Sequence, residues 1–71
     1  MFKVTRFCVV PYEWRRGELV RGEAQQFYTE EEALRVASVV RKRACRVDVY
    51  AVTGWPVQDL WDRPRLVSRS A

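Results

Sequence analysis

Histidine is missing from this chain of 71 residues. Without it the sequence lacks the commonest general base, the Cys2His2 zinc site and the Ser–His and Cys–His nucleophile pairs. There is also no glycine-rich phosphate loop and no metal-ligand spacing. Asp59 and Asp62 flank Trp61 and could bind a cation or a sugar, but two carboxylates in a loop are weak support for a site. We therefore expect no catalytic residues, no metal and no cofactor, and hence a protein that is not an enzyme.

Cysteine is scarce as well, and long apolar runs do not occur. Cys8 and Cys45 are too few for a disulfide framework, and we expect them to be small buried residues. A reactive thiol at Cys45, which lies between Arg43 and Arg46, is the alternative. No window approaches the roughly 18 apolar residues of a membrane span, and the N-terminus has no signal-peptide pattern. We expect a cytoplasmic protein that does not associate with a membrane.

The chain does contain enough apolar residues for one small folded domain, residues 1–71. These residues make up 48% of the sequence, which argues against wholesale disorder. A core of this size is marginal, and such chains often add a second subunit. The net charge of +4 is spread along the chain without a strongly basic segment. Composition alone therefore does not indicate a nucleic-acid footprint.

The most distinct element is a helix predicted over residues 30–44. Thr29 is its expected N-cap, with Glu32 at the capping-box spacing. Glu31 and Arg35 form an i,i+4 pair in the favourable order. One side of the predicted helix is apolar and carries Ala33, Leu34, Val36, Ala37, Val40 and Ala44. This side should face a sheet.

Four strands are predicted around this helix. Residues 2–12 are rich in β-branched and aromatic side chains, and residues 19–27 form a weaker strand in which Gly22 indicates a bulge or a close backbone approach. Residues 46–54 alternate between an apolar and a mixed face, and residues 63–70 return as a last strand. The sequence thus predicts an α+β fold of ββαββ order. It is an antiparallel sheet of three to four strands with one helix packed on one face.

Three short motifs stand out along the chain. They are Gly22-Glu23-Ala24 with Phe27 three residues later, Glu31-Glu32-Ala33 at a helix start, and Trp61 with Pro64 in a terminal hairpin. In these motifs the sequence resembles a family of small uncharacterised bacterial proteins, mostly proteobacterial. The resemblance covers residues 17–69 and agrees with the predicted fold. It implies no activity, because none is established for that family.

The basic stretch VVRKRACR, residues 39–46, has two interpretations. Arg41, Lys42 and Arg43 point in three directions around the predicted helix, where cations near the C-terminus interact favourably with the helix dipole. Helix stabilisation is the first interpretation, and phosphate contact is the second. The tryptophans lie in or beside predicted turns and suit either the core edge or a recognition surface. If the chain binds nucleic acid, the expected contacts are Arg41, Lys42, Arg43, Arg46, Trp55 and Trp61.

The first predicted strand is apolar on both faces, whereas one helix can cover only one of them. If the helix meets the face with Phe7 and Val9, the opposite face needs a partner, because soluble monomers rarely expose large apolar patches. The expected interface residues are then Val4, Cys8, Val10, Tyr50 and Val52. Arg6 and Asp48 would lie on the same face and pair across the strands. We expect a small protein-interaction module acting as a homodimer; a nucleic-acid-binding module using Arg, Lys and Trp is the alternative.

Overall fold

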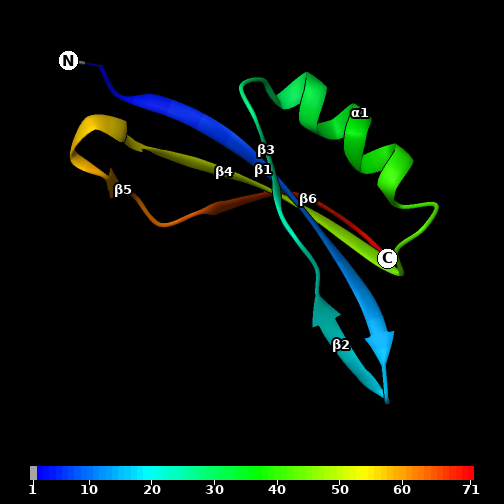
Figure 1. Cartoon of the computed structure of the whole chain (residues 1–71). Coiled ribbons are helices and arrows are strands. Elements are labelled where there is room, and N and C mark those ends of the chain that lie inside the picture. The colour runs from blue at the N-terminus through cyan, green and yellow to red at the C-terminus, as the bar shows by residue number, and fades with distance from the viewer. Residues whose placement is uncertain (1) are drawn as a thin grey trace.

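Two long strands, β1 (Val4–Arg15) and β4 (Arg46–Trp55), lie side by side at the centre of the fold. The structure is a computed structural model that describes residues 2–71. β1 and β4 pair antiparallel from Val4 opposite Gly54 to Tyr12 opposite Arg46. The remaining strands are β2 (Glu18–Arg21) and β3 (Gln25–Phe27) beside β1, and β5 (Leu60–Trp61) and β6 (Arg65–Ser70) beside β4. Together they form a twisted, curled antiparallel sheet (Figure 1).

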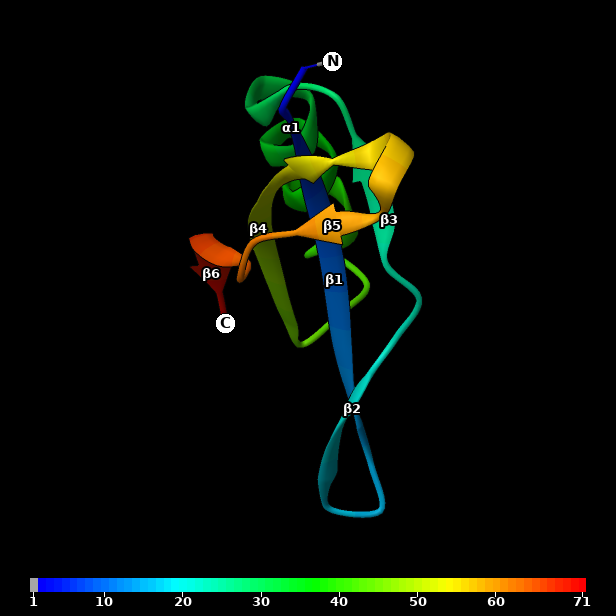
Figure 2. The same cartoon turned by 90° about the vertical axis from the view of Figure 1, so that its left-hand side faces the viewer.

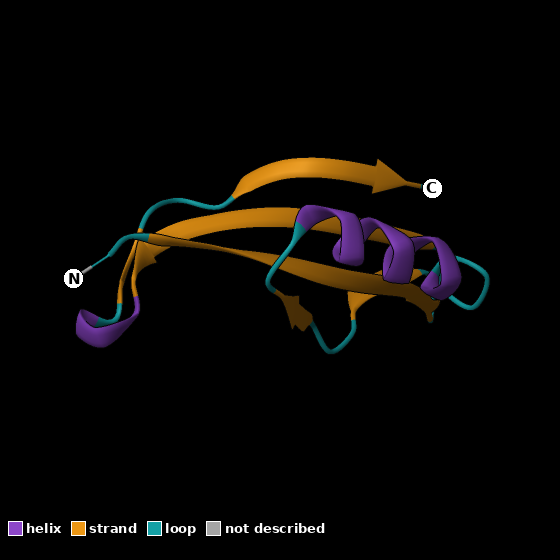
Figure 3. Ribbon diagram, turned by 90° about the horizontal axis from the view of Figure 1, so that it is seen from above, coloured by secondary structure: helices purple, strands orange, loops and turns teal. Residues whose placement is uncertain are grey.

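A single α-helix, α1 (Glu30–Val40), packs against one face of this sheet (Figure 3). The short 3-10 helix η1 (Pro56–Gln58) lies in the turn between β4 and β5, at one end of the molecule. The chain is therefore an α+β protein with an antiparallel sheet and one α-helix, as the sequence predicts. The sheet has six strands rather than three to four, because the predicted strand over residues 19–27 is divided into β2 and β3, and because residues 60–61, expected to lie in a loop, form β5.

The division of the first outer strand is caused by Pro11 and Gly22. β2 pairs with Tyr12 to Arg15 and β3 pairs with Phe7 to Val9, so the break lies beside Pro11. Proline has no N–H for the strand ladder. The Gly22 N–H donates to the Pro11 carbonyl at 2.7 Å, and a Cβ at Gly22 would lie 3.1 Å from Pro11 Cγ. The close backbone approach predicted at Gly22 is confirmed.

The β1–β2 hairpin projects beyond the part of the sheet that α1 covers (Figure 2). It turns at Arg16 and Gly17, whose φ angles are 54° and 79°. Two consecutive positive φ angles match the two-residue type I′ turn, whose twist fits that of the flanking strands. Gly17 adopts this geometry without steric cost, whereas Arg16 does not.

The helix begins where the sequence predicts and ends four residues earlier. Thr29 has extended backbone angles, and its Oγ1 accepts a hydrogen bond from the Glu32 N–H at 3.2 Å. The i,i+4 ion pair between Glu31 and Arg35 is present at 3.6 Å. After Val40 and its cap residue Arg41 the chain continues in a tight turn closed by short-range backbone hydrogen bonds, so the predicted helix end at residue 44 is wrong.

The early end of α1 allows the chain to return to the sheet. Ala44 is buried in the core, and the next residue lies against β1. Both the N–H and the thiol of Cys45 donate to the Tyr12 carbonyl, at 3.0 and 3.1 Å. These contacts fix the chain at the start of β4, where a longer helix would carry it past the end of β1.

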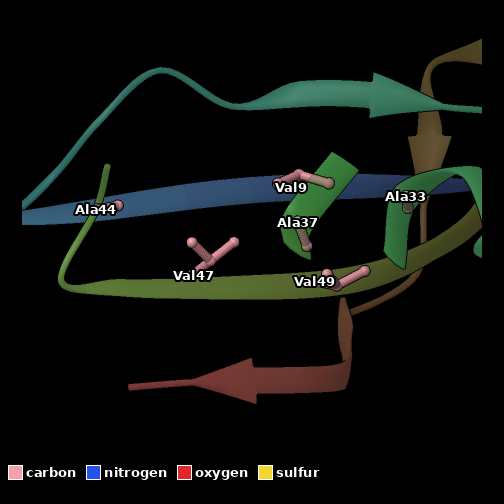
Figure 4. Packing of buried hydrophobic residues seen from close by; sticks show 6 residues of the cluster. All are labelled: Val9, Ala33, Ala37, Ala44, Val47 and Val49. Atoms are coloured by element: carbon pink, nitrogen blue, oxygen red, sulfur yellow. The ribbon is translucent and has the colours of Figure 1, made fainter. Parts of the chain in front are cut away.

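The core lies between α1 and the central strands. Its buried members are Val9, Ala33, Ala37, Ala44, Val47 and Val49, whose side chains gather between the helix and the sheet (Figure 4). The small alanines let the helix approach closely, while Phe7, Phe27, Val40 and Val67 pack around the edge of the cluster. The helix therefore meets the face of β1 that carries Phe7 and Val9. Because side chains alternate along a strand, the even-numbered residues of β1 and β4 point to the other face.

Candidate functional site

The sheet face opposite α1, here called the open face, is defined by the pairing register. Cross-strand partners point to the same side of a sheet. Arg6 pairs with Val52, Cys8 with Tyr50, Val10 with Asp48, and Tyr12 with both Arg46 and Arg21. On β6, Leu66 is opposite Tyr50 and Arg69 is opposite Asp48. A bulge between Val49 and Tyr50 in this pairing lets Leu66 and Arg69 share the open face although they are three residues apart.

Four of the five interface residues predicted from the sequence line one groove on the open face. The groove has a volume of about 250 Å³ and is lined by Cys8, Val10, Tyr12, Arg21, Tyr50, Val52 and Pro64. Val4 lies farther along β1, opposite Gly54, and does not line the groove. Val10 is only 1% exposed, whereas the other predicted interface residues are half-buried. The open face is therefore a shallow hollow rather than a flat apolar patch.

A fully buried carboxylate, Asp48, lies opposite Val10, one of the residues that line this groove. Arg46 donates to it side-on, with Nε 3.1 Å from Oδ1 and Nη2 2.9 Å from Oδ2. Arg69 does the same, with distances of 2.9 and 3.0 Å to the same two oxygens. The Tyr50 hydroxyl donates to Oδ2 at 3.0 Å. These four residues form the Asp48 cluster, in which one carboxylate orients two arginines and a tyrosine.

The protonation states of the Asp48 cluster are fixed at neutral pH. Burial would raise the pKa of Asp48, but hydrogen bonds from Arg69, Arg46 and Tyr50 outweigh it and hold that pKa well below its usual range. The hydrogen bonds to Asp48 raise the pKa of both Arg46 and Arg69. Burial, followed by the hydrogen bond to Asp48, raises the pKa of Tyr50. The cluster thus contains two cations, one anion and a neutral hydroxyl, and carries one excess positive charge.

The pairing of Arg6 with Asp48 predicted from the sequence is wrong. Arg6 lies opposite Val52 and Asp48 opposite Val10, so the two are four residues apart along β1. At about 3.3 Å per residue this separation is too long for an ion pair. Arg6 instead lies over the ring of Tyr28, at 4.5 Å from its centroid. Asp48 takes its second arginine from β6, which the sequence did not suggest.

The open face carries more positive than negative charge. Arg6, Arg21, Arg46 and Arg69 lie on it, and Asp48 is the acidic residue among its paired positions. The four arginines and Asp48 give the open face a net charge of +3, which is most of the net charge of +4 that the whole chain carries. A basic surface concentrated in this way is the footprint expected of a polyanion-binding protein. Its origin in the fold explains why a scan along the sequence finds no basic segment.

Aromatic rings accompany these arginines. The Arg46 guanidinium lies over the Tyr12 ring at 4.3 Å from its centroid. Tyr12 and Tyr50 both line the groove, on neighbouring strands. Trp14, paired with Leu19, continues the same side of β1 into the projecting hairpin and is 64% exposed. Rings and guanidinium groups on adjacent strands form the kind of platform on which unpaired bases stack.

The nucleic-acid contacts predicted from the sequence do not come together. Arg41, Lys42 and Arg43 lie in the turn that follows α1, where Arg41 donates to the Ala44 carbonyl at 2.9 Å. They are beyond the last helical turn, which itself contains no basic residue. Arg46 begins β4, and Trp55 ends it. Trp61 lies beside Gly54 at that far end and donates from Nε1 to Asp59 at 3.0 Å. Of the predicted set, Arg46 alone belongs to the Asp48 cluster.

Three residues of the site, Arg69, Arg21 and Tyr12, were missed by sequence reasoning. A single acidic residue in the middle of an apolar strand, Asp48, was the signal that a buried cation partner must exist. The identity of that partner depended on the bulged register of β6, which local sequence does not contain.

Among residues 2–71 no group of three His, Cys, Asp or Glu side chains is arranged to hold a metal ion. Cys8 and Cys45 are free, half-buried thiols. The Cys45 thiol donates to the Tyr12 carbonyl at 3.1 Å. The prediction that both cysteines are buried is wrong, because each keeps part of its surface exposed.

Comparison with known proteins adds no further constraint. Neither a family model, nor a curated protein, nor a solved structure matches the chain. The resemblance to small proteobacterial proteins therefore stays a prediction from short motifs. Within residues 2–71, no helix has the length and apolar character needed to cross a membrane.

Proposed function

We propose that the chain is a small non-enzymatic binding module and that its open face binds single-stranded nucleic acid. The observation that carries the proposal is the gathering of four arginines on the face that also presents Tyr12 and Tyr50 in a groove. Arginine supplies planar, permanently charged donors for phosphate, and aromatic rings accept stacked bases of any identity. A single strand fits better than a duplex, because bases within a duplex are already stacked on one another.

A homodimer formed through the same face is the second candidate function. Its support is the half-buried apolar and aromatic surface of Cys8, Tyr50 and Val52. Two features count against it. A second copy would bring its own four arginines against those of the first, and like charges juxtaposed at an interface are unfavourable. Val10, the most buried apolar residue of the face, is already covered within one chain and gains little from a partner.

A titration of labelled oligonucleotides separates these candidates. An eight-nucleotide oligouridylate should bind the protein more tightly than a duplex of the same length. With four arginines engaged, the logarithm of affinity should fall against the logarithm of salt concentration with a slope of about −3. Arg21→Gln should reduce that slope by about 1. The matched control is Arg65→Gln, which removes an arginine from the opposite face of β6.

Two further outcomes would contradict the proposal. If reversing the charges of Arg41, Lys42 and Arg43 weakens binding more than Arg21→Gln does, the contact surface is the turn after α1 and not the open face. If the free protein sediments as a dimer at tens of micromolar and Tyr50→Glu makes it monomeric, the second candidate replaces the first. We also propose a cytoplasmic location, which the two free thiols support because reducing compartments keep cysteines unpaired.

A further inference from the structure

The two arginines of the Asp48 cluster keep donors that Asp48 does not use. Each guanidinium has five N–H groups in a fixed fork. Both arginines engage Asp48 through Nε and Nη2. Within residues 2–71 the Nη1 groups of both arginines make no hydrogen bond, so these donors remain available to a ligand. The Arg69 side chain also interacts with the Tyr50 hydroxyl, whereas Arg46 keeps its second Nη2 donor as well. The side chains of Arg46 and Arg69 are 24% and 45% exposed, which leaves them open to a ligand from solvent.

Their spacing suits one phosphate group. Nη2 of Arg46 lies 2.9 Å and Nη2 of Arg69 lies 3.0 Å from the same oxygen, Oδ2 of Asp48. The two nitrogens are therefore no more than about 6 Å apart. Because charge-assisted N–H···O bonds are about 2.8 Å long, two oxygens of a single phosphate can bridge that gap. The one excess positive charge of the cluster matches the single negative charge of a phosphodiester.

The groove beside the cluster supplies a place for a base. Tyr12 touches the cluster through Arg46, and Tyr50 touches it through Asp48, while both rings also line the groove. A volume of about 250 Å³ is below the usual range of drug-sized pockets and suits one planar ring system. A phosphate on the arginines and a base in the groove would therefore belong to the same nucleotide.

We infer that Arg46 and Arg69, held by Asp48, form a phosphate clamp for a nucleotide whose base lies between Tyr12 and Tyr50. This inference rests on the proposed function and adds to it the contacts of one nucleotide unit. Asp48 is a positioning residue: it is buried and touches no ligand, but its two oxygens orient both guanidiniums and lower the entropy cost of binding. The same chemistry would recognise a free nucleoside monophosphate or a nucleotide within a strand.

The test is an NMR titration of the wild-type protein that follows the arginine side-chain N–H signals and the tyrosine rings. Uridine 5′-monophosphate should shift the signals of Arg46, Arg69, Tyr12 and Tyr50. Uridine without the phosphate should bind roughly tenfold more weakly, since charge-assisted hydrogen bonds are lost. Inorganic phosphate should shift the two arginines and leave the tyrosine rings in place. Absence of any shift at Arg46 and Arg69 with the monophosphate would overturn the clamp.

Variants on β6 provide the matched comparison. Arg69→Gln should weaken binding of the monophosphate and of the oligouridylate about tenfold, and Arg69→Lys should recover only part of it because lysine lacks the planar fork. Arg65→Gln should have no effect, because Arg65 lies on the helix side opposite Ala51. If oligouridylate binds but Arg69→Gln and Arg65→Gln weaken it equally, the proposed function holds and the clamp is wrong. If only the monophosphate binds, and Arg69→Gln alone weakens it, the clamp holds and the proposed function is wrong.

Discussion

Val10 and Asp48 face each other across β1 and β4, and both are withdrawn from solvent although α1 lies on the other side of the sheet. Val10 is 1% exposed and Asp48 is 0% exposed. The long side chains around Asp48 close over its carboxylate. A sheet face without a helix is thus partly enclosed by its own polar residues. The surplus of apolar surface that motivates a dimer is smaller than the sequence suggests.

Replacing Asp48 by Asn should destabilise the protein. The amide keeps the shape of the carboxylate, but it presents an NH2 group to a guanidinium and leaves two cations without their anion. We expect a loss of about 2 kcal/mol in the free energy of unfolding. This is less than the ~3–5 kcal/mol of an enclosed pair, because Arg69 is partly open to water. Urea denaturation measures it. The control is Asp62→Asn, which removes an exposed partner of Lys3; equal losses for the two variants would contradict the prediction.

Acid should weaken the fold through the same carboxylate. The pKa of Asp48 is lower in the folded protein than the ordinary value of 3.8, so the unfolded chain takes up this proton first. The contribution of Asp48 to stability is complete above the ordinary value and declines as the pH falls from there toward the lower native pKa. Urea midpoints measured between about pH 5 and pH 2 should fall less steeply for Asp48→Asn than for the wild type. Identical slopes would show that other carboxylates govern acid unfolding.

The N-cap of α1 should be measurable by one substitution. Thr29→Ala removes the acceptor for the Glu32 N–H and should cost about 1 kcal/mol of stability. Thr29→Ser keeps the hydroxyl and should stay close to the wild type. Thermal unfolding followed by circular dichroism compares the three proteins. A loss of similar size in both variants would point to the threonine methyl group rather than the cap.

Substitutions at the two central residues of the β1–β2 turn should change the stability of the protein in opposite directions. Gly17→Ala meets no neighbouring atom within 4 Å, yet its φ of 79° is strained for alanine, and we expect a loss of about 1 kcal/mol. Arg16→Asn places a residue that tolerates positive φ in the first central position and should stabilise by a few tenths of a kcal/mol. Denaturant midpoints check both signs. Loss of stability in Arg16→Asn would show that the Arg16 side chain contributes more than its backbone strain costs.

Local patterns in the sequence predicted the parts of the fold that depend on neighbouring residues. Thr29 and Glu32 marked the start of α1. The alternation of Val47 and Val49 marked an apolar face of β4, but which face of the sheet meets the helix stayed open until the core was known. The end of α1 could not be predicted, since it is set by contacts between Cys45 and Tyr12, which are far apart in sequence.

The site, too, has parts that local sequence predicts and parts that depend on residues far apart in the chain. Alternation placed Cys8 and Tyr50 on one face before the structure did, because strand periodicity is local. The hydrogen bonds from Arg69 to Asp48 join two residues that are 21 apart in the sequence, and they depend on a bulge in the pairing of β4 with β6. The concentration of arginines on the open face arises only when four strands are aligned, so charge along the chain gave no sign of it.

The break between β2 and β3 at Gly22 has a consequence for self-assembly. A sheet grows into a fibril only when it offers an unbroken row of backbone donors and acceptors at both of its borders. On one border of this sheet the row is divided between β2 and β3, which have four and three residues, because the Gly22 N–H turns inward to the Pro11 carbonyl. The border formed by β6 presents six residues in sequence. The divided border offers little backbone for pairing with another copy, so Gly22 and Pro11 protect it against edge-to-edge aggregation.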